Sequence, residues 1–176
     1  MDQNPNHFSL FGLPVGFALD AAALQPLWRE LQRRYHPDRY ASAEAGEQQR
    51  AVHMASLVNQ AYDTLRDPVK RARYLLELAG HGIDGERATV ADTDFLMAQM
   101  DLREQLDEAE TPEALDGLED EAQDWLDNLL REFPIDYDAQ DWSEAADTLR
   151  KMQFMTRLLD EIREQRERLE DELDAL

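Results

Sequence analysis

The sequence predicts an all-α protein, in which a helical hairpin with flanking helices is followed by an antiparallel three-helix bundle. Apolar residues recur at helical spacing in almost every long segment of the 176 residues, and no segment alternates as a strand would. Charge divides the chain: residues 1–80 hold nine acids and nine bases, whereas residues 81–176 hold thirty acids and nine bases. We therefore expect two modules, at 1–80 and 93–176, joined by a linker at 81–92.

The composition excludes several classes of function. No cysteine is present, which rules out disulfides, thiolate nucleophiles and cysteine-based zinc sites and favours a reducing, cytoplasmic setting. We expect neither a secretory signal nor a membrane span, because no segment has the apolar run that either requires. The net charge of −21 argues against nucleic acid or anionic lipid as a partner. It favours a basic partner, or solubility alone.

The first module begins with a short helical turn at residues 8–13, which Gly12 and Pro14 end. Asp20 is the predicted N-cap of the next helix, and Pro37 ends that helix. Its apolar stripe consists of Leu24, Leu27, Leu31 and Tyr35. A polar loop then leads into a helix with apolar positions at Ala51, Met54, Ala55, Val58, Ala61, Tyr62 and Leu65.

A closing helix completes the first module. Asp67 and Pro68 predict its start, and Gly80 predicts its end. Its apolar stripe of Val69, Ala72, Leu75, Leu76 and Ala79 is expected to pack back on its neighbours.

The three helices of the bundle are expected at 93–109, from Thr111 to Pro134, and from about 139 to the C-terminus. The core positions of the second are Leu115, Leu118, Ala122, Trp125, Leu126, Leu129 and Phe133. Those of the third are Trp142, Ala145, Leu149, Met152, Leu159, Ile162, Leu169 and Leu173. Packing these faces against one another gives the simplest core.

The first bundle helix has more apolar surface than one buried face requires. Phe95, Ala98, Leu102, Leu106 and Ala109 form a stripe that can enter the core. Met97 and Met100 lie nearly opposite, and on the third helix Phe154 and Leu158 lie off the core stripe. We expect these residues to form an adaptable protein-binding patch beside carboxylates. The alternative is that they fill the seam of a wide three-helix core.

The stretch YHPDRY directly follows the first long helix. His36 precedes a proline and is expected at the helix exit, while Pro37 fixes the turn that presents Asp38. Arg29 and Arg33 lie one turn apart and predict a basic strip. Taken alone, such a turn is usually structural and such arginines are usually a solvated face. A hydrolytic or metal role for His36 and Asp38 lacks the further ligands or bases that it needs.

The stretch LQRRYHPDRY, with NQAYDTLRDPVKRARYLLEL after it, resembles a J-domain. Together with FSLFGLP and DTDFLMAQMDLREQLDE, it makes the chain resemble, from about residue 8 to its end, the HscB family of iron–sulfur cluster co-chaperones. Eukaryotic relatives often carry a cysteine-based zinc module, so this cysteine-free chain resembles the bacterial form. The resemblance implies a J-domain at 1–80 and a scaffold-binding bundle at 93–176.

The resemblance also implies two binding sites and no catalytic, cofactor or metal site. The first would contact an ATPase chaperone of the DnaK/HscA class and stimulate its ATP hydrolysis; its residues are Arg29, Arg33, Arg34, His36, Pro37 and Asp38. The second would bind an IscU-type scaffold protein; its residues are Leu96, Met97, Met100, Asp101, Glu104, Glu108 and Phe154. Two alternatives stay open: a general J-domain co-chaperone that presents unfolded clients, and an enzyme that uses His36 and Asp38.

Overall fold

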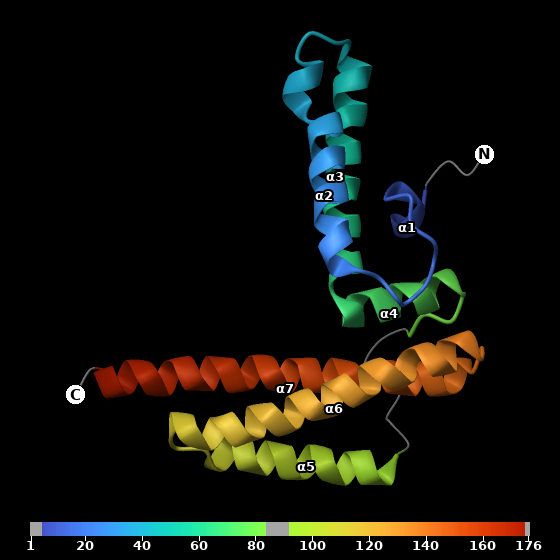
Figure 1. The fold of residues 1–176 in the computed structure, drawn as a ribbon. Helices are drawn as coiled ribbons and strands as arrows, with labels where there is room; N and C mark the ends of the chain where they lie inside the picture. The colour runs from blue at the N-terminus through green and yellow to red at the C-terminus, as the bar shows by residue number, and fades with distance from the viewer. Residues whose placement is uncertain (1–4, 84–91, 175–176) are drawn as a thin grey trace. The chain divides into compact units, whose positions relative to one another are not determined.

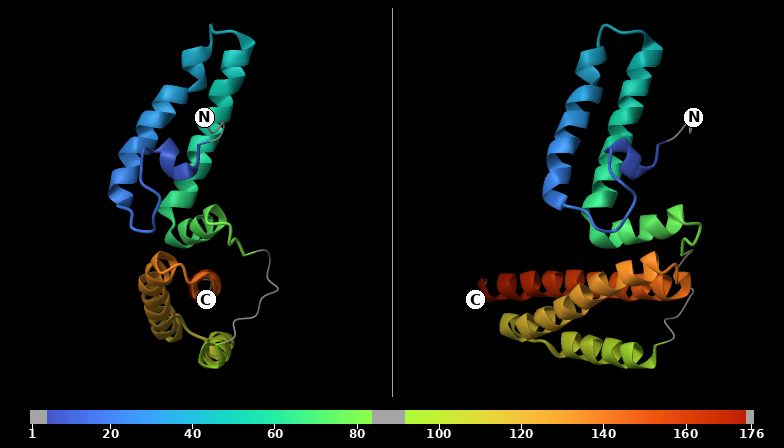
Figure 2. Two further views of the ribbon diagram at one scale, coloured as in Figure 1. Left: turned by 90° about the vertical axis from the view of Figure 1, so that its right-hand side faces the viewer. Right: turned by 45° about the vertical axis from the view of Figure 1, so that its right-hand side comes forward.

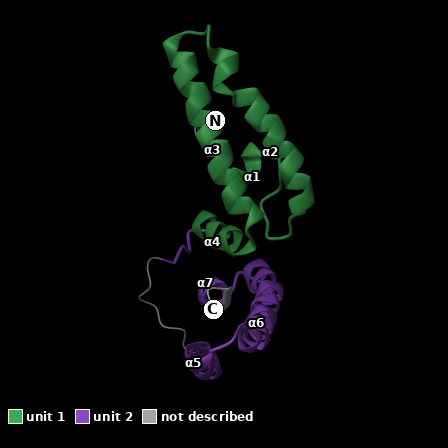
Figure 3. Ribbon diagram, turned by 90° about the vertical axis from the view of Figure 1, so that its left-hand side faces the viewer, with its two compact units in different colours: residues 1–79 green, residues 80–176 purple. Residues whose placement is uncertain are grey.

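A computed structural model describes residues 5–83 and 92–174 of the chain (Figure 1). All regular structure in those ranges is helical, which confirms the all-α prediction. The chain divides into two compact units, residues 1–79 and 80–176 (Figure 3). Most of the predicted linker, residues 84–91, lies outside the described residues.

The first unit is a helical hairpin with short helices beside it. Its elements are α1 (His7–Leu10), α2 (Ala21–Tyr35), the 3₁₀ helix η1 (Pro37–Tyr40), α3 (Ala45–Arg66) and α4 (Pro68–Leu78). Helices α2 and α3 lie side by side, and α1 and α4 both pack on α3 (Figure 2). The predicted caps are present: Asp20 accepts the Ala22 amide at 2.9 Å, and Asp67 accepts the Val69 amide at 2.9 Å.

The core of this unit is narrow, and α2 is therefore largely a surface helix. Its fully buried side chains include Phe8, Leu24, Val58, Leu65, Leu75 and Leu76. Of the stripe predicted for α2, Leu24 is buried, whereas Leu27, Leu31 and Tyr35 are half-buried. Over most of its length α2 packs on one neighbour, α3, so the remaining faces of α2 stay open to a partner.

The second unit is the predicted three-helix bundle. Its helices are α5 (Thr93–Glu108), α6 (Pro112–Asp138) and α7 (Trp142–Asp174). Consecutive helices run antiparallel, so α5 and α7 run parallel: Lys151 of α7 pairs with Asp92, and Gln165 reaches the Leu106 carbonyl. The predicted core position Leu169 is half-buried, and the side chain of Leu173 lies outside the described residues.

Pro134 does not end the second bundle helix, contrary to the sequence prediction. Helix α6 continues through it to Asp138, and the backbone turns at Gln140, whose φ is 59°. A proline removes one amide and crowds the preceding turn, but only one further turn follows here. The rings of Phe133 and Tyr137 stack across that turn with centroids 5.9 Å apart. The local rule for proline is therefore overridden by packing at the helix end.

Candidate interaction sites

The His-Pro-Asp step forms the junction between α2 and η1. His36 has φ −60° and ψ 128°, the extended geometry that a following proline favours, so α2 ends at Tyr35. The Nδ1 atom of His36 accepts the Asp38 amide at 3.2 Å and thereby caps η1. The ring nitrogen accepts this hydrogen bond through its lone pair.

The carboxylate of Asp38 projects from this loop into solvent. Its side chain is 90% exposed, and one oxygen lies 3.6 Å from His36 Nδ1. The loop thus presents one exposed negative charge on a backbone that Pro37 and the Asp38 amide already hold in place.

Two residues that the sequence analysis left without a role tie this loop back to α2. Arg39 Nη1 donates to the Arg33 carbonyl at 3.4 Å, and the Tyr40 hydroxyl donates to the Arg34 carbonyl at 3.3 Å. The last carbonyls of a helix have no intrahelical partner, and these donors supply one. The signal was present in the sequence, since donors directly after a helix stop are typical partners for such carbonyls.

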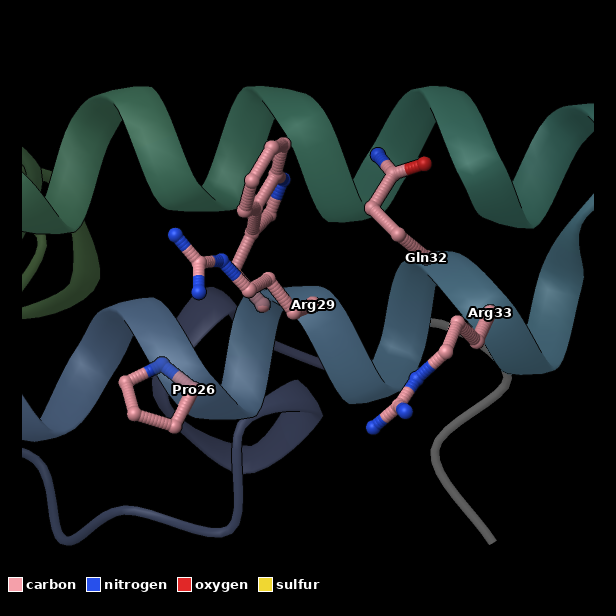
Figure 4. Close-up of a pocket in the computed structure, with 5 residues that line it drawn as sticks. Pro26, Arg29, Gln32 and Arg33 are labelled. Atoms are coloured by element: carbon pink, nitrogen blue, oxygen red, sulfur yellow. The ribbon is translucent and has the colours of Figure 1, made fainter.

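The predicted basic strip is on the surface. Arg29, Arg33 and Arg34 are all exposed, as are His36, Pro37 and Asp38, so the six residues of the first predicted site lie along α2 and the loop that follows it. An open groove on α2 is lined by Pro26, Trp28, Arg29, Gln32 and Arg33 (Figure 4).

Contacts between α2 and α3 fix the direction in which the strip faces. Gln32 points toward α3 and Arg33 points away from it (Figure 4). The Asn59 side-chain oxygen on α3 accepts the Trp28 indole N–H at 3.0 Å and also accepts from Gln32. The Trp28 ring stacks on Tyr62, with centroids 4.9 Å apart. These contacts set the rotation of α2 and leave the arginines outward.

Helix α5 has the two faces that its sequence predicts. Its inner face is buried: Phe95 and Leu102 are each 1% exposed. On the outer face Met97 is 61% exposed and Met100 is 71% exposed. The carboxylates of this face are also exposed; they belong to Asp101, Glu104 and Glu108. Leu96 is half-buried at its edge.

The expectation that Phe154 and Leu158 lie off the core is wrong. Phe154 is 6% exposed and Leu158 is fully buried. The Phe154 ring meets Phe95 edge-on, with centroids 5.8 Å apart. Helix α7 packs against α6 on one side and meets α5 on another, so its buried arc is wider than one stripe. Here the alternative reading of the sequence, a wide three-helix seam, is correct.

Polar contacts hold α5 to α7 beside this seam. The Lys151 ammonium lies 2.6 Å from the Asp92 carboxylate, which also caps α5. The hydrogen bond from Lys151, with those from the backbone amides of Phe95 and Asp94, lowers the pKa of Asp92. Farther along the helix, the Arg103 guanidinium pairs with the Glu161 carboxylate through both terminal nitrogens.

Neither a metal-binding cluster nor a membrane-spanning helix is found in the described ranges. Within residues 5–83 and 92–174, no three histidine, aspartate or glutamate side chains are grouped so as to hold a metal. Over the same residues, no helix combines the length and apolarity that crossing a bilayer requires.

Family comparisons match both units. Residues 6–74 match the model of the DnaJ domain, and residues 91–163 match that of the HSCB C-terminal oligomerisation domain. The chain is 43% identical over 172 residues to the co-chaperone protein HscB homolog of Acinetobacter baumannii, covering 97% of this chain and 95% of that protein.

Solved structures agree with this match. The chaperone HscB from Vibrio cholerae is 38% identical, with a TM-score of 0.81 over 96% of this chain and 99% of that one. Human co-chaperone protein HscB is 30% identical, with a TM-score of 0.88 over 94% of this chain and 84% of that one. A J-domain, the bundle that follows it and these identities lead to one conclusion: the chain belongs to the HscB family, the J-domain co-chaperones of iron–sulfur cluster assembly.

Proposed function

We propose that the chain stimulates the ATPase of a chaperone of the DnaK/HscA class and delivers to it an IscU-type scaffold protein, on which iron–sulfur clusters are built. A J-domain family implies an Hsp70-type partner. The observation that carries the proposal is the exposed, internally hydrogen-bonded loop at His36, Pro37 and Asp38 beside an exposed arginine strip. Hydrolysis belongs to the partner, and the chain catalyses no reaction.

The loop and the strip have complementary parts in this recognition. Little conformational entropy is lost when a partner binds the loop, because Pro37 and the Asp38 amide already order it. The Asp38 carboxylate is free to accept a charge-assisted hydrogen bond from a partner arginine. Arg29 and Arg33 would attract an acidic surface and speed its association.

The outer face of α5 suits a partner with an apolar centre and basic surroundings. Met97 and Met100 provide exposed thioether side chains that adapt to an irregular surface. Asp101, Glu104 and Glu108 lie beside them and would complement lysines or arginines of the scaffold. Binding both partners on one chain raises the local concentration of the scaffold at the chaperone.

The test of the first half is the steady-state ATPase rate of a DnaK/HscA-class chaperone with and without this chain. We expect Asp38→Asn to abolish stimulation while helicity and scaffold affinity stay at wild-type values. Asp63→Asn is the matched control, because Asp63 is an exposed aspartate of α3 whose partner is Arg66. Full stimulation by Asp38→Asn would overturn the proposal, and so would loss of scaffold binding in the same variant.

A general J-domain co-chaperone is the second candidate, because exposed methionines can pack against many apolar clients. Capture of proteins from a lysate of the source cells separates the two. One dominant small scaffold protein supports delivery of a specific client, whereas a broad range of unfolded clients supports the general role. We place the activity in the cytoplasm, the reducing compartment that a cysteine-free chain suits. ATP turnover by the isolated chain would contradict the assignment of catalysis to the partner.

A further inference from the structure

Arg103 lies at the border between the buried and the outer face of α5. At 100° per residue, it is about 60° around the helix from Met100 and about 100° from the buried Leu102. Its guanidinium carbon lies 5.5 Å from the centre of the Phe154 ring, and Nη2 donates to Glu161 at 3.2 Å. The second terminal nitrogen also bonds the Glu161 carboxylate, so the pair is bidentate across α5 and α7.

The apolar contacts of α5 alone constrain its rotation weakly. Its three large buried side chains are Phe95, Leu102 and Leu106. By helical geometry they fall within a sector of about 40°, so they form one narrow line along the axis. Such a line resists separation of the helices but offers little leverage against rolling. A directional contact well away from that line adds to the constraint, and Arg103 makes one in the C-terminal half of the helix.

The ion pair between Arg103 and Glu161 is only partly exposed to solvent. The side chains of Arg103 and Glu161 are 42% and 40% exposed, so solvent screens them only in part. The Arg103 guanidinium lies over the buried Phe154 ring, and that ring packs edge-to-face with Phe95. Phe154 therefore connects the inner side of α5 to the ion pair above it.

We propose that Arg103 is a positioning residue for scaffold binding: paired with Glu161 above the Phe154 ring, it holds α5 at the rotation that presents Met97 and Met100. This inference rests on the proposed function of the outer face. It also gives the buried Phe154 a role, as the support of the ion pair.

The test is the dissociation constant of the full chain for an IscU-type scaffold protein, measured by titration calorimetry. Partly exposed ion pairs of this kind couple by enough to change an affinity about fivefold. We expect Arg103→Gln and Glu161→Gln each to weaken binding about threefold to fivefold. The exchanged pair, Arg103→Glu with Glu161→Arg, is expected to recover most of the loss, because it restores the bond between the helices.

Arg166→Gln is the matched control. Arg166 makes a comparable ion pair between helices, with Glu119 at 2.6 Å and Asp116 at 2.8 Å, but it joins α7 to α6. We expect its loss to lower the melting temperature as the loss of Arg103 does, yet to change scaffold affinity less than about twofold. Circular dichroism verifies that the bundle of every variant is folded, and chaperone stimulation verifies that the first unit is unaffected.

Each outcome decides between the possibilities. If Arg103→Gln weakens binding but Glu161→Gln does not, Arg103 contacts the scaffold directly and the positioning role is wrong. If both single changes weaken binding and the exchanged pair stays as weak as either, the role is also wrong. Met97→Asp tests the outer face itself: unchanged binding in that variant would overturn the proposed function. Loss of binding in Met97→Asp with wild-type binding in Arg103→Gln would overturn only the inference about Arg103.

Discussion

Asp92 combines two roles in one carboxylate. One oxygen accepts the amides of Asp94 and Phe95 and so caps α5, while the other accepts a hydrogen bond from Lys151 of α7. Lys151 is only 16% exposed, so its ammonium depends on this partner more than a surface lysine would. The lowered pKa of Asp92 expresses the same interactions as a preference for the charged form.

Asp92→Asn should reduce the pH dependence of stability. Asparagine caps a helix about as well as aspartate, so the change removes mainly the charge. Because the pKa of Asp92 is lower in the folded state than its ordinary 3.8, its contribution is present at neutral pH. The contribution declines as the pH falls below that ordinary value and is lost below the folded pKa. In urea unfolding between pH 7 and pH 3, the wild type should have the larger free energy of unfolding at pH 7. The difference between the wild type and the variant should shrink below about pH 4.

Gln140 holds a backbone conformation that glycine adopts more easily. Its φ of 59° follows the end of α6, where left-handed geometry closes many helices. Gln140→Gly should therefore raise the free energy of unfolding by about 0.5–1 kcal/mol, after allowing for the greater freedom of glycine in the unfolded chain. Gly80→Ala is the converse control: Gly80 has a φ of 79°, so this change should lower the free energy of unfolding of the protein. A loss of stability in Gln140→Gly would contradict this reading of the turn.

At the level of elements, the rotation of α2 and the rotation of α5 are fixed by different kinds of polar contact. Each must present an outer face in a fixed direction while packing on few neighbours. Helix α2 is oriented by Asn59, which accepts from Trp28 and Gln32. Helix α5 is oriented by ion pairs at Asp92 and Arg103. In both helices, polar contacts beside a narrow apolar seam set the rotation of the outer face.

Substitutions on the two faces of α5 should separate stability from binding. Leu102→Ala leaves a cavity at a side chain that is 1% exposed and should cost about 2–5 kcal/mol of unfolding free energy. Met97→Ala removes an exposed side chain and should change stability by less than about 0.5 kcal/mol while weakening scaffold binding. Ile135→Ala, at another exposed apolar position of the bundle, should change neither. Denaturant unfolding and calorimetry measure the two effects; equal destabilisation by Leu102→Ala and Met97→Ala would contradict the division of faces.

The sequence predicts the buried and exposed faces of each helix well, but it predicts the contacts between helices poorly. Spacing alone identified the buried and outer faces of α5, because the helical period depends only on the local backbone. The burial of Phe154 could not be predicted in this way, since it depends on α5 lying against α7, far away in sequence. Likewise, Pro134 is a helix breaker by local rules, but α6 continues to Asp138, with Phe133 fully buried and Tyr137 packed edge-to-face on Trp142 of α7. Arg103 was missed because no sequence spacing relates it to Glu161.

Over the whole molecule, charge is divided between the units that carry the two proposed sites. Residues 1–80 carry no net charge but expose the arginine strip of α2, whereas residues 81–176 carry the entire net charge of −21. Under the proposed function, the two sites would attract partners of opposite charge, which favours binding both partners at the same time rather than in competition.

The salt dependence of scaffold binding should separate the electrostatic contribution of the acidic face from the contribution of its apolar contacts. Raising the ionic strength from about 0.05 M to 0.5 M shortens the screening length several-fold and should slow association with the scaffold. Met97→Ala should instead speed dissociation, because it removes an apolar contact of the bound state. Stopped-flow or surface-binding kinetics separate the two rates. Association that is independent of salt would contradict a role for the acidic face.

The requirement for both sites on one chain can be measured as scaffold-dependent ATPase of the chaperone, using two singly defective variants together. Asp38→Asn retains the scaffold face, and Met97→Asp retains the loop. If one chain must hold both partners at once, an equimolar mixture of the two variants should give less than about a tenth of the scaffold-dependent stimulation given by the wild type. Wild-type stimulation by the mixture would mean that loop and face act on separate molecules, and the chain would then not deliver a scaffold.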